Sequence, residues 1–246
     1  MQAYEKFFNG MTEIFAKIQS TQGENIDKAA SIIAECIEND GILHVFGTGH
    51  ANLIAEDISM RANTLGPINH VSDVSLSGTV NSFRSAFLER VEGLGGVVFE
   101  TVRPQPQDVF LVISNSGRNA VSIEFAKAAK EHGHTVVAET SVSFSLNQPS
   151  RHSSGKRLLD YADVILDNQV PYADMVVKVE GQKFMGLGPA SGMAGMYIVH
   201  ATLVQAAMLM VEKGLEAPVN ISGNLDEGHE YNMRLLEKYW SRLRNL

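Results

Sequence analysis

Short apolar runs alternate with helical patterns along most of this chain, and this alternation limits the folds open to it. Strand-like runs cover 42–46, 109–113, 135–138 and 163–166, with weaker candidates at 67–71, 96–99 and 175–179. The segments between the clearest runs carry apolar residues at the spacing of an amphipathic helix. Strands that alternate with helices are typical of a parallel sheet. The chain is therefore predicted to be an α/β protein.

The residues before the first strand-like run predict two helices. Apolar residues recur at helical spacing over 7–18 and again over 26–37, with a break near Gly23. No repeat, low-complexity tail or linker divides the chain. We expect one domain over 1–246, with a helical hairpin at 1–40, the sheet and its site at 41–214, and a C-terminal helical extension at 215–246.

The composition excludes several classes of protein. The 246 residues, 44% hydrophobic and 20% charged, can bury the core of one large α/β domain. A formal net charge of −8 argues against broad binding to nucleic acid or anionic membranes, which require a basic surface. Cys36 is the single cysteine, so an internal disulfide is excluded, and residues 1–14 lack the apolar core of a secretory signal. We expect a cytoplasmic protein.

One stretch is apolar and long enough to cross a membrane. Residues 192–211 carry no formal charge, but His200, Thr202 and Gln205 interrupt the stretch, and no second span accompanies it. We expect a helix buried in the core or in a subunit interface, and no membrane partner.

A polar loop follows the apolar run 109–113. It contains Ser114, Asn115, Ser116, Gly117, Arg118 and Asn119, and a helical pattern begins directly after it. Backbone N–H groups at a helix N-terminus carry partial positive charge, and hydroxyl donors beside them favour phosphate binding. The alternative is that Ser114 or Ser116 only caps the helix while Gly117 makes a turn.

A second loop of small residues follows the run 42–46. Gly47, Thr48, Gly49 and His50 stand between that run and another helical pattern. Ligands of open parallel sheets bind at the carboxyl ends of the strands, where the winding direction reverses. The two loops are therefore expected to face one crevice. A dinucleotide fingerprint is disfavoured because Asn52 stands where it needs a third glycine.

At these loops the chain resembles the SIS, or sugar isomerase, domain over roughly residues 30–211. It is most similar to the phosphoheptose isomerases and their uncharacterised relatives, which share two leading helices and a long final helix carrying histidine. The resemblance implies a five-stranded parallel sheet flanked by helices, a flavodoxin-like three-layer sandwich, in a homo-oligomer, either a dimer or a tetramer.

The resemblance also implies which residues bind a sugar phosphate. Ser114, Ser116 and Asn119 would contact the phosphate, although Asn119 stands where the family usually has threonine; its amide can still donate. The expected ligand-binding residues are Gly47, Thr48, Gly49, His50, Ser114, Asn115, Ser116 and Asn119.

Two residues resemble the catalytic groups of the family. His200 has the setting of the histidine on the final helix, and Glu56 follows the first loop as the family's glutamate does. The residues alone leave alternatives open, since His200 can be a core histidine and Glu56 a solvated side chain. Asp57 and Arg61 are four apart on the same helical pattern and can form an exposed ion pair.

Two further polar clusters stand outside the motif. Residues 151–156 offer donors for an anion, or else begin a capped helix. Asp226, Glu227, His229 and Glu230 are of metal-ligand types, but acidic loops are usually only solvated. We expect no metal and no cofactor, but leave open whether His152, Asp226, Glu227 or His229 closes the site or binds a metal.

The resemblance implies a sugar-phosphate isomerase that moves a proton between neighbouring carbons through an enediol. His200 has a suitable pKa by nature, whereas Glu56 would need burial. The alternatives are a sugar-phosphate sensor without chemistry, and a lyase or etherase acting on an amino-sugar phosphate. The fold cannot choose among them.

Overall fold

A five-stranded parallel sheet lies at the centre of the structure, a computed structural model that describes residues 1–243. The strands follow the order β2-β1-β3-β4-β5 across the sheet. Their bounds are β1 Leu43–Gly47, β2 Ile68–His70, β3 Val109–Ile113, β4 Thr135–Thr140 and β5 Val164–Asp167. The four clearest strand predictions and the weaker one at 67–71 are confirmed.

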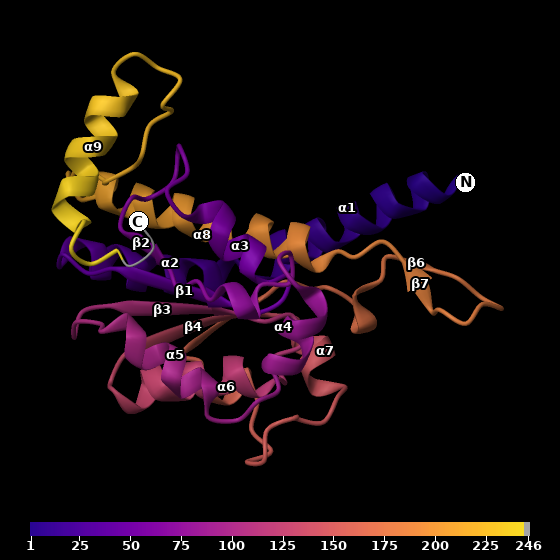
Figure 1. The fold of residues 1–246 in the computed structure, drawn as a ribbon. Coiled ribbons are helices and arrows are strands. Elements are labelled where there is room, and N and C mark those ends of the chain that lie inside the picture. Colours follow the sequence, from indigo (N-terminus) through magenta and orange to yellow (C-terminus); the bar gives the residue numbers. More distant parts are fainter. Residues whose placement is uncertain (244–246) are drawn as a thin grey trace.

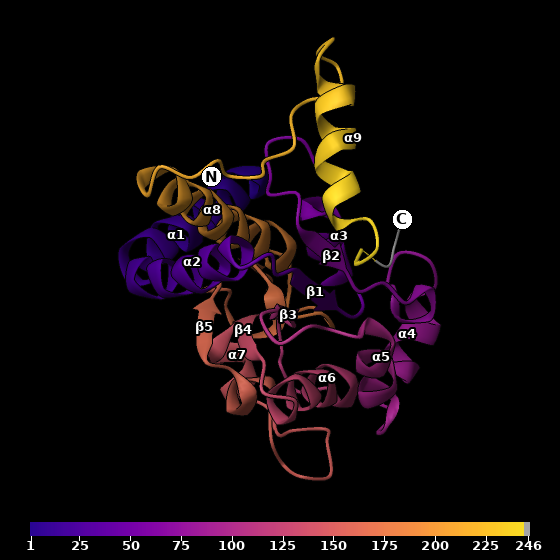
Figure 2. The same ribbon diagram turned by 90° about the vertical axis from the view of Figure 1, so that its left-hand side faces the viewer.

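Helices cover both faces of the sheet and make three layers (Figures 1 and 2). Side chains of a strand alternate between its faces, so Leu111 and Ile113 of β3 join one apolar core while Phe110 and Val112 join the other. The first core is shared with α1 (Ala3–Thr21), α2 (Gly23–Glu38), α3 (Asn52–Ile58) and α8 (Ser191–Glu212), and the second with α5 (Leu94–Val102) and α6 (Ala120–Glu131). The predicted fold class is therefore confirmed, including the N-terminal helical hairpin.

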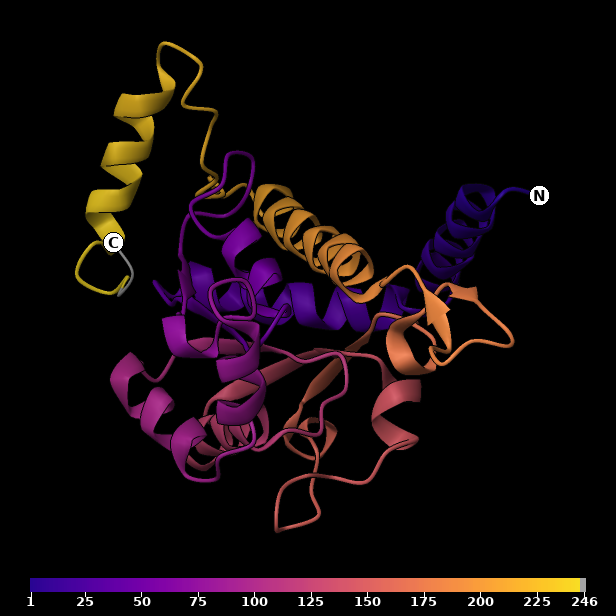
Figure 3. The same cartoon turned by 45° about the vertical axis from the view of Figure 1, so that its right-hand side comes forward.

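The remaining elements are short and lie around the sheet. They are the helices α4 (Ser82–Leu88), α7 (Val142–Leu146) and α9 (Gly228–Tyr239), the 3-10 turns η1 (Val74–Leu76), η2 (Leu158–Tyr161) and η3 (Tyr172–Asp174), and a two-stranded ribbon of β6 (Val177–Lys178) and β7 (Gly186–Leu187). The ribbon and α9 project away from the sheet (Figure 3).

Two of the weaker strand predictions need correction. The run 96–99 lies inside α5, because Val98, Phe99 and Val102 form the buried face of a helix, and a short apolar run does not distinguish helix from strand. The run 175–179 contributes only β6, outside the main sheet. Within the predicted loop 141–157, α7 forms one short helix whose Phe144 N–H donates to the Ser141 hydroxyl.

The apolar stretch 192–211 lies within α8. By length and composition α8 is the one helix of residues 1–243 that could cross a membrane, and 44% of its most apolar window is buried in the protein. Ala194, Ile198 and Leu203 belong to the core shared with α2. These contacts support the expectation of a helix built into the core.

The winding direction reverses between β1 and β3. The strands are adjacent, with Leu43 opposite Val109 and Gly47 opposite Ile113. The helix that follows β1, α3, packs on one face of the sheet, whereas the helix that follows β3, α6, packs on the other. The loops after these two strands therefore diverge at the carboxyl edge of the sheet, where ligands of such folds bind.

Candidate functional site

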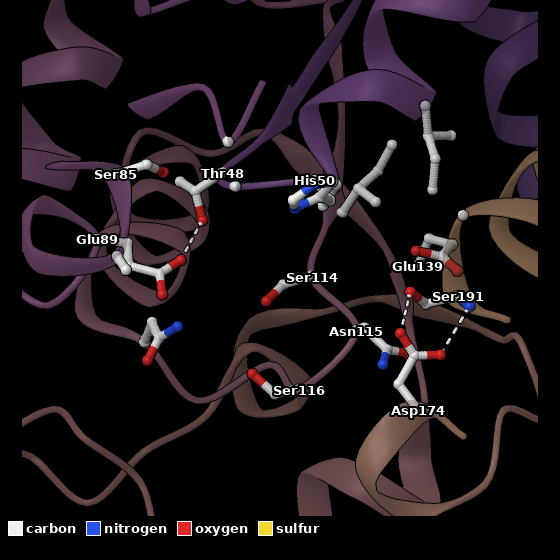
Figure 4. A pocket seen from close by; sticks show the side chains of 18 of the residues that line it. Thr48, His50, Ser85, Glu89, Ser114, Asn115, Ser116, Glu139, Asp174 and Ser191 are labelled. Atoms are coloured by element: carbon white, nitrogen blue, oxygen red, sulfur yellow. Dashed lines mark hydrogen bonds between the residues drawn. The ribbon is translucent and has the colours of Figure 1, made fainter. Parts of the chain in front are cut away.

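A cavity of about 340 Å³ opens at this carboxyl edge. Its walls come from the loops after β1 and β3, one face of α4, the end of β4 and the first turn of α8 (Figure 4). The sequence-predicted residues Thr48, Gly49, His50, Ser114, Asn115, Ser116 and Asn119 all line it. The two loops therefore face one crevice, as expected.

The loop after β3 is shaped to lead into the N-terminus of α6. The Ser114 hydroxyl accepts from the backbone N–H of Gly117 (3.2 Å), so this serine organises the turn. Gly117 has φ +58°, which favours glycine, and a Cβ there would lie 3.1 Å from the Ser145 hydroxyl oxygen. The Ser116 side chain is directed into the cavity (Figure 4). Ser114 thus stabilises the loop itself rather than capping α6, whereas Ser116 presents its hydroxyl to the cavity.

The loop after β1 forms the opposite wall. Gly47 ends the strand and is not a lining residue; a Cβ there would approach the Ala51 carbonyl to 2.9 Å, so glycine lets the turn close. Gly49 has φ +61°, and its N–H donates to the carbonyl of Leu76 (2.8 Å). The turn exposes the Thr48 and His50 side chains to the cavity (Figure 4).

Glu89 is a cavity residue that the sequence patterns did not single out. It follows α4 and accepts a hydrogen bond from the Thr48 hydroxyl (3.1 Å). Burial raises the pKa of its carboxyl, against the opposing effects of the Thr48 hydrogen bond and of Arg90 and Arg151. Glu89 reaches the site only through the position of α4, which no local pattern specifies.

Glu139, near the end of β4, is a second cavity residue that was missed. It is 1% exposed, and Asn168 Nδ2 donates to its Oε1 (2.8 Å). Burial, and to a lesser degree Asp167 and Asp174, raise the pKa of Glu139 to about 8. The apolar run that predicted this strand ends at 138, so the usable signal was an acidic residue directly at the carboxyl end of a parallel strand.

Asp174 brings a third carboxyl to the cavity, but its oxygens are already occupied. They accept from the backbone N–H groups of Ala190 and Ser191 (both 2.8 Å) and from the Ser191 hydroxyl (2.7 Å). Asp174 thus caps α8 and fixes its first turn against the cavity. Among residues 1–243, no lysine or arginine lines this cavity.

The fold and these loops match proteins already described. A profile of the SIS domain matches residues 6–141, more than half of the chain. The chain belongs to the SIS domain family.

Relatives and solved structures agree with this assignment. A UPF0309 protein of Geobacillus kaustophilus is 35% identical over 238 residues, covering 97% of this chain and 94% of the relative. A phosphoheptose isomerase from Neisseria gonorrhoeae matches with a TM-score of 0.56 at 20% identity, over 82% of this chain and 95% of that one. The sugar isomerase domain of an RpiR transcription factor from Sphaerobacter thermophilus matches with a TM-score of 0.51 at 15% identity, over 98% and 99%. At these identities the structural likeness shows the SIS fold alone.

The two residues predicted to be catalytic lie outside this SIS-domain cavity. Glu56 is exposed on α3. His200 Nε2 lies 2.8 Å from Asp57 Oδ2, and His200 lines a separate surface hollow. Asp57 also pairs with Arg61, so the predicted ion pair is present. The structure therefore does not bring Glu56 and His200 together with the cavity residues, and their catalytic role stays a prediction.

The polar clusters outside the motif lie elsewhere in the SIS domain. Arg151 Nη1 donates to Asn119 Oδ1 (2.9 Å), which ties the loop 147–157 to the start of α6. Asp226, Glu227 and His229 are exposed at the start of α9 and are not cavity residues.

One group in the described chain combines metal-ligand types at short range, namely Glu92, Glu124 and His152. Its atoms already have partners within the protein. Glu92 accepts from the Ser153 N–H and hydroxyl, and Glu124 accepts from two glycine N–H groups. His152 Nδ1 lies 2.6 Å from the Ser154 hydroxyl oxygen. These hydrogen bonds connect the segment 92–95 to the loop 147–157 through Glu92 and to α6 through Glu124.

Proposed function

We propose that this SIS domain binds a sugar phosphate in the cavity and interconverts its aldose and ketose forms. One observation carries the proposal. A single cavity at the switch point joins the hydroxyl-rich loop before α6 to the half-buried carboxyl of Glu89 and the buried carboxyl of Glu139. The first feature suits a phosphate, and the second suits proton transfer to and from a sugar.

The chemistry of the walls supports a phosphate held by neutral donors. No lysine or arginine of the described residues lines the cavity, so the anion would rely on N–H groups at the start of α6 and on hydroxyls such as that of Ser116. The ligand-binding assignments to Thr48, Gly49, His50, Ser114, Asn115, Ser116 and Asn119 are part of this proposal. Gly47 would act by shaping the turn.

A second function is favoured by a specific observation. The sugar isomerase domain of a transcription factor matches this chain over nearly its whole length, and the predicted catalytic residues lie outside the cavity. A sensor would use the same cavity to bind a sugar phosphate and leave it unchanged. Turnover, rather than binding, separates the two functions.

We also propose that the chain works in the cytoplasm as a homo-oligomer. Large apolar side chains of α8, among them Val204, Met208 and Val211, are exposed at spacings that place them on neighbouring turns. Such a stripe suits contact with another helix. Sedimentation of the purified chain measures its oligomeric state, and a monomer at micromolar concentration would contradict the proposal.

Thermal unfolding against a panel of hexose, pentose and heptose phosphates tests the proposed binding. We expect a sugar phosphate to raise the melting temperature, and the shift to disappear in Ser116→Ala. Ser20→Ala, an exposed serine on α1, is the matched control and should keep the shift. No shift with any sugar phosphate would exclude the proposed ligand class.

A further inference from the structure

One carboxyl oxygen of Glu139 is hydrogen-bonded and closely packed. Asn168 Nδ2 donates both to Glu139 Oε1 (2.8 Å) and to Asn115 Oδ1 (3.1 Å), which links the carboxyl to the loop after β3. On the other side, α8 has glycine at Gly195, where a Cβ would lie 2.9 Å from Glu139 Oε1. Asn168, in the loop after β5, therefore holds one oxygen of a carboxyl that lines the cavity, and α8 packs close to that oxygen because residue 195 is glycine.

Glu89 lies across the cavity from Glu139, with Ser114 and Ser116 between them (Figure 4). Among residues 1–243, neither carboxyl forms an ion pair with lysine, arginine or histidine. Their surroundings nevertheless differ. Burial raises the pKa of both carboxyls. The pKa of fully buried Glu139 reaches about 8, whereas at half-buried Glu89 the hydrogen bond from Thr48 and the charges of nearby arginines oppose the rise. Two carboxyls in unequal environments can serve as an acid and a base.

We propose that Glu89 and Glu139 are the proton-transfer groups of this cavity, with Glu89 as the base at carbon and Glu139 as the acid at oxygen. The inference rests on the proposed isomerisation and deepens it. It differs from the sequence-based assignment to Glu56 and His200.

The transfers balance without a cofactor. The Glu89 carboxylate removes the proton from the carbon beside the carbonyl, and the released C–H electron pair forms the carbon–carbon double bond. The carbonyl π electrons take the proton of the Glu139 carboxylic acid, which gives the neutral enediol. Glu89 then returns its proton to the former carbonyl carbon, and the other hydroxyl of the enediol returns a proton to Glu139. Both side chains finish as they began.

The pH response follows from the charged groups around the two carboxyls. Asp167 of β5 and Asp174 of η3 face Glu139, Arg90 and Arg151 act on Glu89, and His50 lines the same cavity. Because the pKa of Glu139 lies at about 8, activity should fall as the pH rises through this value and the acid is lost. The Glu139→Gln variant should lack this alkaline limb in its residual activity.

The test compares turnover and binding of the same panel of sugar phosphates in the full chain. Turnover is followed as conversion of the aldose phosphate to the ketose phosphate. We expect Glu139→Gln and Glu89→Gln each to lose about 100-fold or more in kcat while keeping the ligand-induced melting shift. Glu131→Gln, an exposed glutamate on α6, is the matched control for the substitution.

Each outcome supports or overturns the assignment of Glu89 and Glu139 as proton-transfer groups. Unchanged turnover in either glutamine variant overturns the assignment of that residue, and loss of turnover in His200→Gln alone assigns the chemistry to α8. Binding by the wild type without conversion of aldose to ketose overturns the acid–base pair but leaves sugar-phosphate binding intact. No binding by the wild type overturns both proposals. If one variant does not fold, as judged by its melting transition, the other variant decides.

Discussion

Two buried carboxyls at opposite ends of the central sheet have opposite surroundings. Asp108, directly before β3, accepts from the backbone N–H groups of Ile42 and Gln105 and from Arg242 Nη2 (2.6 Å to each oxygen). His44 Nε2 lies 3.0 Å from it. Glu139, near the end of β4, has Asn168 as its one side-chain donor among residues 1–243.

The number of hydrogen-bond donors around each buried carboxyl decides whether its ionised form is favoured. Burial alone would raise the pKa of Asp108, but hydrogen bonds from His44, Arg242 and two backbone N–H groups hold it at about 2. Burial dominates at Glu139, where the pKa rises to about 8. At the amino end of the sheet, the ionised Asp108 is thus paired with Arg242, which holds the segment after α9; we call this pair the lock. At the carboxyl end, the protonated form of Glu139 is favoured, so this carboxyl can donate a proton.

Breaking the lock is expected to give the largest effect on stability. Arg242→Ala removes the arginine that pairs with the buried Asp108, and it should lower the free energy of unfolding by about 3 kcal/mol. Urea denaturation at pH 7 measures the change. Arg234→Ala, which removes an exposed pair on α9, is the control and should change little. A loss no larger than that control would show that the amino end is not locked.

The opposite pKa shifts should give the two ends opposite pH responses. The folded-state pKa of Asp108 lies below its ordinary value of 3.8, so its contribution to stability is present above that value and is lost as the pH falls toward 2. The folded-state pKa of Glu139 lies above its ordinary value of 4.5, so the folded chain holds the extra proton between about 4.5 and 8. Stability therefore falls as the pH rises through that window.

Urea midpoints at pH 5 and pH 8 test the carboxyl end. We expect the wild type to lose up to about 1 kcal/mol per pH unit from this group, and Glu139→Gln to lack that slope. Equal slopes in the two proteins would mean that Glu139 is ionised in the folded state and that the contrast with Asp108 is wrong.

The sequence predicted the parts of this arrangement that are local. Apolar runs identified β1, β3, β4 and β5, and small polar residues after two of them identified the cavity loops. The run 96–99 was wrong because four apolar residues do not reveal which face of an element is buried. Glu89 and Asp174 could not be found in this way, because α4 and η3 bring them to the cavity through tertiary packing.

The lock shows the same limit from the other end of the sheet. Asp108 and Arg242 are 134 residues apart, and no spacing rule connects a residue before a strand with one after the last helix. Burial acts on the pKa of both carboxyls, and burial depends on elements that are distant in sequence. Local patterns therefore placed the loops, whereas the charges that distinguish the two ends required the folded chain.

Alanine substitutions at two glycines, one at each end of the sheet, should have the smallest effects and compare the two ends most directly. An alanine at position 117 would have to adopt φ +58°, and its Cβ would lie 3.1 Å from the Ser145 hydroxyl oxygen. An alanine at position 41, at the amino end of the sheet, would place its Cβ 2.6 Å from the Cys36 carbonyl oxygen. Gly117→Ala and Gly41→Ala should each cost about 1–2 kcal/mol in unfolding free energy, by strain and by overpacking respectively. Denaturant unfolding checks that the two losses are similar.

Ligand binding should separate these matched variants. Gly117→Ala displaces the loop that aims Ser116 at the cavity, so the sugar-phosphate melting shift should shrink, whereas Gly41→Ala should keep the full shift because it alters only the amino end of the sheet. A shift reduced equally in both variants would mean that binding follows global stability. Loss of the shift in Gly117→Ala alone would locate ligand recognition in the loop before α6, at the end of the sheet where the carboxyls remain open to chemistry.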